Sequence, residues 1–475
     1  MAIAASDAPF QVDITAAERD EAGMSDRAEN NSMSAQVAPL RVQRAPAPLR
    51  GDVVVPGDKS ISHRALMLAA MAQGRSEISG LLEGEDVLRT ASAMRALGAE
   101  IRQDGARWVV YGHGAQGLRE PDDVLDMGNS GTAARLMAGI LSTQPFNSLM
   151  TGDASLRARP MKRVTDPLQK NGACFVTRQG GRLPMVVVGT AQGTPIHYRL
   201  PVASAQVKSA ILLAGLNAQG ETLVDEPTPT RDHTENMLRY FGVDVAVNET
   251  DSGGRLIRLT GPAHLNAQNV IVPGDPSSAA FPIVAALLIP GSDLIIRNVG
   301  LNPLRTGLLT SLQEMGAQIT IEDIRREGGE RVGDLRVKAS TLRAVDVPEK
   351  RAPSMIDEYP ILSVACAFAE GTSRLRGLGE LRVKESDRLN ATLALLKANH
   401  VTARIDGDDL VIEGRPDGDG LGGGRVETLM DHRLAMSAII FGLAASNPID
   451  VDDTGFINTS FPGFIDLMNK MGAGL

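Results

Sequence analysis

The chain has 475 residues, a formal net charge of −9 and an isoelectric point near 5.4. Because a surface for nucleic acid or for an anionic membrane needs a basic face that displaces counterions, this charge balance argues against both kinds of partner. The sequence contains no uninterrupted apolar run of about 18 residues, so it predicts no membrane span. Its length exceeds the size at which one hydrophobic core usually stops growing, which favours two domains.

Residues 1–46 differ in composition from the rest of the chain. They have little apolar periodicity and carry scattered acidic, serine and asparagine residues up to the stretch APAP at residues 45–48. A segment of this kind buries too little apolar surface to offset the entropy of folding, so we expect a disordered extension over residues 1–46. It lacks the basic and apolar regions of a secretory signal, and we expect a cytoplasmic protein.

From residue 47 onward a unit of about 70 to 80 residues recurs six times. In each unit a polar loop runs into an apolar helical stretch. In chain order the loops are PGDKSISHR from Pro56, MGNSGTAAR from Met127, PVASAQVKS from Pro201, PGDPSSAAF from Pro273, PSMIDEYPI from Pro353 and LMDHRLAMS from Leu429. Short β-like runs alternate with them, at residues 52–55, 107–111, 184–188, 270–272, 335–337 and 410–412. This alternation predicts an α/β or α+β fold.

Six units divide naturally into three per domain. We place the boundary at the loop that opens the fourth unit, with the short segment before the first loop returning to the second half of the chain. The predicted domains are therefore domain I, residues 47–56 and 273–475, and domain II, residues 57–272.

The two cysteines, Cys174 and Cys366, lie far apart among small or apolar neighbours. This setting predicts buried thiols in a reducing compartment and neither a disulfide nor a metal pair. No histidine or cysteine cluster has the spacing of metal ligands, so we expect no metal site. The loop GNSGT from Gly128 lacks the residue order of a nucleotide-binding P-loop, so nucleotide binding has little support.

Basic residues recur at the starts of the predicted helices. A cation in a first helical turn opposes the helix macrodipole by roughly 0.3 to 1 kcal/mol, whereas the free backbone N–H groups there attract anions. A solvated surface cation explains any one such residue, but six at comparable places indicate an anionic ligand. The six are Lys59, Arg64, Arg159, Lys384, Arg388 and Arg433.

Acidic side chains lie among these cations at Asp357, Glu385 and Asp431. Asp357 and Asp431 could simply cap helices. Acids surrounded by cations can also have the shifted pKa values that general acid–base catalysis requires. Short polar residues at the same helix starts, such as Asn129 and Ser204, are common caps and are weak signals by themselves.

Six motifs carry a resemblance to a known family. In chain order they are PGDKSISHR, GNSGTAAR, GDASLRARPM, RVKESDRL, DHRLAM and TSFPGF, all within residues 39–475. Through them the chain resembles the enolpyruvyl transferases, and among these the branch that acts on shikimate 3-phosphate. The wording PGDKSISHR and the run Ser204, Ala205 and Gln206 are more similar to the second bacterial class of that branch than to the first.

The resemblance implies a fold and a reaction. The fold is α/β (α+β), with two domains of three βαβαββ repeats each, approximate threefold symmetry, and helix N-termini that face a cleft. The reaction transfers the enolpyruvyl group of phosphoenolpyruvate to the 5-hydroxyl of shikimate 3-phosphate and releases phosphate through a tetrahedral intermediate. No cofactor is implied. We expect a monomer, because the cleft of this family lies within one chain.

The resemblance also implies site residues. For shikimate 3-phosphate they are Lys59, Ser60, Arg64, Ser204, Ala205, Gln206, Arg231, Asp357 and Lys384. For phosphoenolpyruvate they are Lys59, Asn129, Gly131, Arg159, Gln206, Arg388 and Arg433. Asp357 would take the proton of the 5-hydroxyl, Glu385 would protonate the methylene carbon and later deprotonate it, and Lys59 would share this work. A glycine at residue 131 implies room for the inhibitor glyphosate, which an alanine would exclude.

Three alternatives remain at this point. The sister enzyme that uses UDP-N-acetylglucosamine normally has a cysteine on the loop where this chain has Ala154. A binding protein on the same scaffold would lack some of the acids or cations. An RNA-end-processing enzyme built from similar units conflicts with the acidic charge balance.

Overall fold

The computed structural model describes residues 38–475, so most of the expected N-terminal extension lies outside the described residues. Strand β1 (Leu40–Val42) nevertheless falls within the range that composition assigned to that extension, and it pairs antiparallel with β23 (Ile449–Val451). The side chain of Val42 is fully buried against Gly442. The ordered chain therefore starts before residue 47, because a partner strand from the far end of the sequence orders this short apolar segment.

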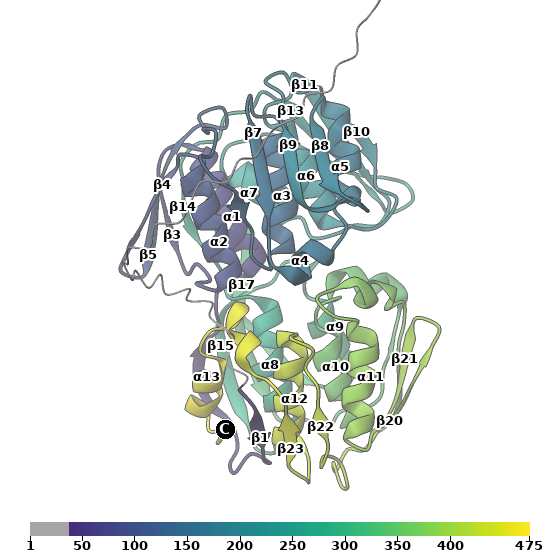
Figure 1. Cartoon of the computed structure of the whole chain (residues 1–475). Coiled ribbons are helices and arrows are strands. Elements are labelled where there is room, and N and C mark those ends of the chain that lie inside the picture. Colours follow the sequence, from purple (N-terminus) through teal and green to yellow (C-terminus); the bar gives the residue numbers. More distant parts are fainter. Residues whose placement is uncertain (1–37) are drawn as a thin grey trace, which may run out of the picture. The chain divides into compact units, whose positions relative to one another are not determined.

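Within residues 38–475 the strands form six sheets with one shared pattern (Figure 1). A first strand runs parallel to a second, the second is antiparallel to a third, and in five of the sheets a fourth strand adds to the third. Two of the four-stranded sheets are β14 (Asn269–Ile271), β3 (Gln73–Ser79), β5 (Arg107–His113), β4 (Glu100–Asp104), and β6 (Leu125–Asp126), β7 (Asn147–Thr151), β9 (Arg182–Val188), β8 (Cys174–Arg178).

The other sheets have the same order of strands. They are β10 (His197–Arg199), β11 (Gly220–Glu226), β13 (Arg255–Gly261), β12 (Val245–Glu249); β2 (Arg50–Val54), β15 (Asp293–Gly300), β17 (Glu330–Lys338), β16 (Gln318–Glu327); and β18 (Asp346–Val347), β19 (Gly371–Leu375), β21 (Asp409–Gly414), β20 (Thr402–Asp406). The sixth sheet consists of β22 (Arg425–Val426), β23 and β1. Each predicted β-like run overlaps one of these strands, although the runs at residues 52–55 and 270–272 extend one residue beyond β2 and β14.

Each of the six polar loops leads into a helix, as predicted. These helices are α1 (Lys59–Met71), α3 (Gly131–Ser142), α6 (Ala205–Gly215), α8 (Pro276–Leu288), α10 (Tyr359–Ala367) and α12 (His432–Ala444). The remaining α-helices are α2 (Glu85–Ala96), α4 (Ala154–Ala158), α5 (Lys162–Leu168), α7 (His233–Tyr240), α9 (Gly307–Glu314), α11 (Arg388–Ala398) and α13 (Phe464–Lys470). Short 3₁₀ turns occupy Gln169–Asn171, Glu349–Ser354, Gly379–Val383 and Gly455–Thr459. None of the helices in residues 38–475 is long and apolar enough to cross a membrane.

Two sheets exchange their first strands. Strand β2 precedes α1 in sequence but pairs with β15, whereas β14 precedes α8 but pairs with β3. The chain therefore crosses over twice, at residues 55–58 and 272–275. The two crossing segments bond to each other, since the Asp58 N–H donates to the Pro273 oxygen at 2.7 Å and the Asp275 N–H donates to the Pro56 oxygen at 2.9 Å.

The buried apolar side chains form two clusters that follow these crossings. One cluster contains side chains between Ile61 and Val272, and the other contains Val42 to Val55 together with Ala279 to Ala473. Helices such as α8 and α12 are buried on nearly all faces, which explains why their sequences are apolar all round.

Cys366 is buried on α10, and burial raises the pKa of its thiol to about 12. Cys174 is exposed, so the prediction of a buried thiol is wrong for that residue. It begins β8, which is the last strand of its sheet, and the side chains of β8 are only partly covered on either face. Apolar neighbours in sequence therefore did not imply burial.

Helices α3 and α6 pack closely, as Figure 1 also shows, and they bring two polar loops together. A Cβ on Gly139 would lie 2.3 Å from the carbonyl oxygen of Ala210, so only glycine permits this approach. At the N-terminal ends of the same helices, the Gln206 amide donates to the Thr132 hydroxyl at 3.0 Å.

We therefore expect Gly139→Ala to lower the free energy of unfolding by about 1–3 kcal/mol, since the added methyl group overpacks a helix contact. Urea denaturation measures this change. Ser92→Ala, at an exposed position of α2, is the control and should stay within about 0.5 kcal/mol of the parent. Equal stability of the two variants would contradict the close contact.

Candidate active site

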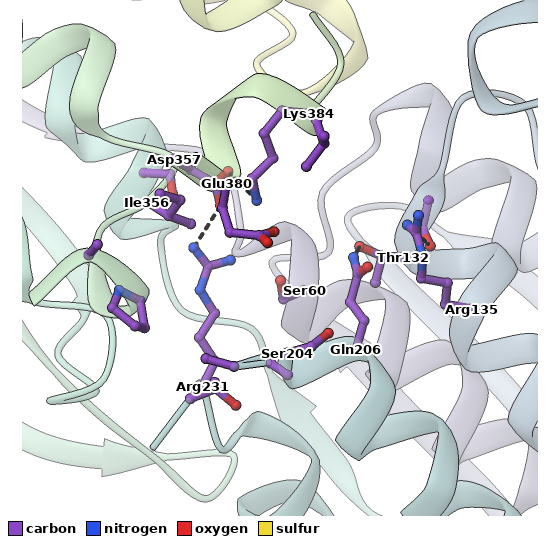
Figure 2. Close-up of a pocket in the computed structure, with 18 of the residues that line it drawn as sticks. Ser60, Thr132, Arg135, Ser204, Gln206, Arg231, Ile356, Asp357, Glu380 and Lys384 are labelled. Carbon is purple, nitrogen blue, oxygen red and sulfur yellow. Dashed lines mark hydrogen bonds and ion pairs between the residues drawn. The ribbon is translucent and has the colours of Figure 1, made fainter. Parts of the chain in front are cut away.

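The main cavity of the described chain has a volume of about 620 Å³. Within residues 38–475, nine basic and six acidic side chains line it, although the chain as a whole carries an excess of acidic residues. Figure 2 shows polar side chains from several elements converging on this space. Basic side chains therefore outnumber acidic ones in the lining of this cavity, which favours an anionic ligand.

Helix N-termini supply much of the lining. The first turns of α1, α3 and α6 contribute Lys59 and Ser60, Gly131 and Thr132, and Ala205 and Gln206. Side-chain caps hold these helix starts, because the hydroxyl of Ser130 accepts the Ala133 N–H and the hydroxyl of Ser204 accepts the Val207 N–H. Several helix dipoles thus point their positive ends at one cavity.

Most of the predicted site residues come together in this cavity. Those that line it are Lys59, Ser60, Asn129, Gly131, Arg159, Ser204, Ala205, Gln206, Arg231, Asp357, Lys384, Glu385 and Arg433. Arg64 and Arg388 are not among the lining residues, and both are buried behind the cavity wall.

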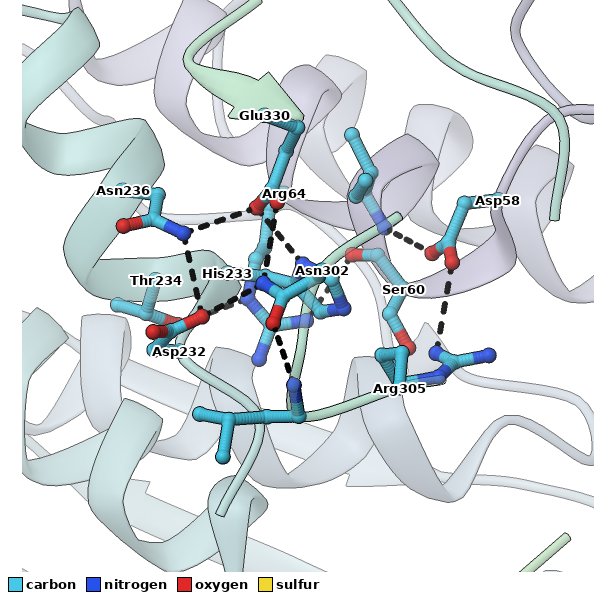
Figure 3. A network of polar contacts seen from close by, with 12 residues as sticks. Asp58, Ser60, Arg64, Asp232, His233, Thr234, Asn236, Asn302, Arg305 and Glu330 are labelled. Atoms are coloured by element: carbon cyan, nitrogen blue, oxygen red, sulfur yellow. Dashed lines mark hydrogen bonds and ion pairs between the residues drawn. The ribbon is translucent and has the colours of Figure 1, made fainter. Parts of the chain in front are cut away.

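Arg64 supports the wall at Ser60 (Figure 3). Its guanidinium donates to the Ser60 carbonyl oxygen at 3.0 Å, to the Thr234 hydroxyl at 2.7 Å and to the Ser209 hydroxyl at 2.8 Å. Burial lowers the pKa of Arg64 to about 10, so the group remains charged at neutral pH. In this structure Arg64 fixes the backbone of α1 beside Ser60.

Arg388 joins three carboxylates. Its guanidinium donates to Asp431 at 2.7 Å and to Asp357 at 3.2 Å, and it pairs with Glu385 at 2.7 Å. The side chain is only 1% exposed, so these ion pairs lie in a setting of low dielectric. Arg388 therefore fixes Asp357 and Glu385 relative to each other.

Asp357 is surrounded by cations. Its carboxylate lies 2.6 Å from Arg231, 3.2 Å from Arg388 and 3.5 Å from Lys384, and Figure 2 shows Arg231 reaching toward it. Burial by itself raises the pKa of Asp357, but Lys384, Arg231 and the neighbouring arginines together hold that pKa well below its usual range. The Asp357 carboxylate is thus ionised at neutral pH.

Glu385 is ionised for a similar reason. Burial by itself raises its pKa, and Arg388 followed by Arg159 outweighs that effect and lowers the pKa below the usual range. His432, which also lines the cavity, is neutral at pH 7, because burial lowers its pKa to about 3. Lys59 forms an ion pair with Asp86.

Arg159 and Arg433 occupy further parts of the wall. The Arg159 guanidinium donates to the side-chain oxygen of Asn129 at 2.9 Å and to the Ser155 hydroxyl at 3.1 Å. The Arg433 guanidinium donates to the Asp357 backbone oxygen at 3.3 Å. Neither arginine has a carboxylate within ion-pair distance in residues 38–475, which leaves both cations available to a ligand.

Sequence reasoning missed Arg135. It lines the cavity one helical turn after Gly131 and donates to the Gly131 carbonyl oxygen at 3.1 Å. Burial, together with the nearby Arg159, lowers the pKa of Arg135 to about 10. Its position four residues after Gly131, within GNSGTAAR, is the sequence signal that could have found it.

The arrangement defines an enzyme-like site for anionic substrates, with two ionised carboxylates held among cations. Across residues 38–475, no group of three or more histidine, cysteine, aspartate or glutamate side chains is arranged to hold a metal ion.

The comparisons with known proteins identify the family. Residues 43–468 match the family model described as EPSP synthase (3-phosphoshikimate 1-carboxyvinyltransferase), and the chain belongs to this family. A relative from Gluconobacter oxydans named 3-phosphoshikimate 1-carboxyvinyltransferase is 68% identical over 92% of this chain and 98% of its own length. A relative of the same name from Acidiphilium cryptum is 63% identical over 93% of this chain and 98% of its own.

A solved structure confirms the predicted fold class. An EPSP synthase from Acinetobacter baumannii superposes with a TM-score of 0.82 at 45% identity, covering 92% of this chain and 98% of that one. The α/β fold of repeated small sheets is therefore that of EPSP synthases.

We expect inorganic phosphate to bind in the cavity and raise the melting temperature, with a stabilisation of about 1.4 kcal/mol at ten times its Kd. Differential scanning calorimetry across a phosphate series measures the effect. Arg159→Gln should weaken it, because the variant removes a cation that has no carboxylate partner in the described chain.

Arg102→Gln is the matched control, since Arg102 lies on the exposed face of β4 and not at the cavity. Phosphate should still stabilise Arg102→Gln through its general effect as a salt, so this variant shows how much of the change in melting temperature is non-specific. The same phosphate response in Arg159→Gln and Arg102→Gln would contradict anion binding at the cavity.

Proposed function

We propose that the protein transfers the enolpyruvyl group of phosphoenolpyruvate to the 5-hydroxyl of shikimate 3-phosphate. The products are 5-enolpyruvylshikimate 3-phosphate and phosphate, in the shikimate pathway to chorismate and the aromatic amino acids. The observation that carries this proposal is the pair of ionised carboxylates, Asp357 and Glu385, joined by Arg388 in a cavity with excess basic side chains. The names of the relatives support the same activity.

Shikimate 3-phosphate would bind at the starts of α1 and α6. Ser60, supported by Arg64, would hold its carboxylate. Its phosphate would meet donors from two sides of the cavity, which are Ser204, the Ala205 backbone, Gln206, Arg231 and Lys384. Guanidinium forks and backbone N–H groups suit such an oxyanion.

Phosphoenolpyruvate would bind beside α3, where Asn129 and Gly131 line the cavity. Arg159 and Arg433 offer free guanidinium donors to its phosphate and carboxylate, and Lys59 would contact both substrates. Arg388 lies behind the wall in this structure, so we propose that it acts on this ligand through Glu385 and Asp357.

Three proton transfers then give the reaction. Asp357, ionised in the free site, accepts the proton of the 5-hydroxyl while that oxygen bonds to the second carbon of phosphoenolpyruvate. Glu385 delivers a proton to the methylene carbon, and later removes one as the phosphate leaves. Lys59 shares this acid–base work.

The proton on Glu385 depends on the substrates. The pKa of Glu385 is below its usual range because Arg388 and Arg159 are close. An anionic substrate that pairs with Arg159, which lines the cavity, offsets part of this effect and raises the pKa of Glu385 toward the range of a proton donor. The two carboxylates also stabilise the oxocarbenium-like state that forms when the methylene carbon is protonated.

The wider expectations remain proposals. We propose a monomer, supported by a cavity whose lining comes from one chain, and a cytoplasmic location. Domain limits at residues 56/57 and 272/273 are supported by the two apolar clusters, which change at these positions. The partners are the two small-molecule substrates, without nucleic acid, membrane or cofactor.

The activity test is phosphate release from phosphoenolpyruvate with either shikimate 3-phosphate or UDP-N-acetylglucosamine as acceptor. We expect release only with shikimate 3-phosphate. Asp357→Ala and Glu385→Ala should each reduce kcat by about 100-fold or more, since each removes a proton-transfer group. Release with the sugar nucleotide alone would assign the chain to the sister enzyme, and release with neither acceptor would indicate a binding protein.

Glyphosate should inhibit the protein in competition with phosphoenolpyruvate. A Cβ on Gly131 would lie 2.5 Å from Arg135 and 3.3 Å from Arg159, both at the ends of flexible side chains. Gly131→Ala should therefore fold, and its methyl group should narrow the space for the inhibitor. We expect the IC50 of glyphosate to rise at least tenfold, which is the size of effect that one methyl group has in a fitted pocket. Unchanged inhibition in this variant, measured at fixed phosphoenolpyruvate, would contradict the proposed pocket.

A further inference from the structure

A buried cluster of charges lies directly behind the proposed phosphate site. Lys208, on α6, is fully buried, and so are its two acidic partners. Its ammonium lies 3.0 Å from Glu226 and 2.8 Å from Glu235, and it donates to the Thr230 carbonyl oxygen at 3.2 Å. All three N–H donors of this lysine therefore have an acceptor.

The cluster holds the connection that carries Arg231. Residues 227–232 link β11 to α7, and Thr228, Thr230 and Arg231 from this connection line the cavity. Thr230 is held at two points, because its carbonyl oxygen accepts from Lys208 and its hydroxyl donates to Glu226. The residue before Arg231 is thus fixed in place.

The same lysine also belongs to the other half of the phosphate site. Ser204 and Gln206 lie at the start of α6, and Lys208 follows them on the same helix. One buried side chain therefore connects the donors at the start of α6 to the connection that carries Arg231.

Stability alone is a poor explanation for this arrangement. Taking one ammonium and two carboxylates out of water is costly, and apolar side chains of similar volume often stabilise a protein as well as a buried ion pair does. Burial raises the pKa of Glu226, which reflects this cost, although Lys208 offsets part of it. A role in positioning neighbouring residues would explain why charged side chains occupy this site in place of apolar ones.

We propose that Lys208 is a positioning residue for shikimate 3-phosphate: it fixes the Thr230 carbonyl and thereby aims the Arg231 guanidinium at the bound phosphate. This inference rests on the proposed function. It predicts an effect on the acceptor substrate and none on phosphoenolpyruvate.

The test compares steady-state kinetics of the parent protein and Lys208→Met. We expect the KM for shikimate 3-phosphate to rise about tenfold, as for a misaligned hydrogen bond to a charged group, and the KM for phosphoenolpyruvate to stay within about twofold. Ile257→Ala is the control, because Ile257 is buried on β13, which pairs with β11, and lies away from the cavity. It should lower the melting temperature without changing either KM.

A double-mutant cycle then tests the route through Arg231. In an Arg231→Ala background, Lys208→Met should no longer change the KM for shikimate 3-phosphate, since the group it positions is gone. An undiminished effect in that background would overturn the proposal. Equal changes in both KM values, or a response like that of Ile257→Ala, would overturn it as well.

If Lys208→Met does not fold, Lys208→Met with Glu235→Gln repeats the comparison, because this pair removes one charge of each sign. Failure of both variants to fold would mark Lys208 as a structural residue and overturn the proposal. An inactive parent protein would instead contradict the proposed function, so the two failures are distinguishable.

Discussion

The chemistry of the site depends on one buried guanidinium. Arg388 lies between Asp357, Glu385 and Asp431, and without it three carboxylates would face one another in a poorly solvated space. Like charges at such distances cannot all remain ionised unless a cation compensates them. Arg388 therefore fixes the acids relative to one another and, together with Lys384, Arg231 and Arg159, keeps Asp357 and Glu385 ionised.

Elsewhere around the cavity, buried cations and cavity-lining cations also differ in what they contact. Arg64 behind Ser60 and Lys208 behind Arg231 are buried and hydrogen-bonded, whereas Arg159 and Arg433 face the cavity without a carboxylate partner among residues 38–475. The buried cations hold neighbouring side chains and backbone in place, whereas Arg159 and Arg433 remain accessible from the cavity. This arrangement keeps the binding groups in place before a ligand arrives, which reduces the ordering needed on binding.

Local sequence patterns predicted the alternation of strands and helices, and the resemblance of six motifs to a known family implied the candidate site residues. The loop from Pro273 and the helix after it were readable because caps and apolar periodicity act over a few residues. Local sequence did not predict that Arg64 and Arg388 point away from the cavity, because their partners Thr234 and Asp431 lie far away in the sequence. Arg135 was missed for a different reason, because an arginine inside a helix usually faces solvent. Strand β1 was missed because its partner lies more than 400 residues away.

The exchange of first strands has a consequence for synthesis on the ribosome. Strand β2 emerges early but pairs only with β15, and β1 waits for β23 near the end of the chain. Residues 57–272 include all strands of their own sheets, so they are able to fold while these first strands are still unpaired. The second apolar cluster closes last, and its slow, long-range pairing leaves two short edge strands exposed to chaperones or to neighbouring chains during translation.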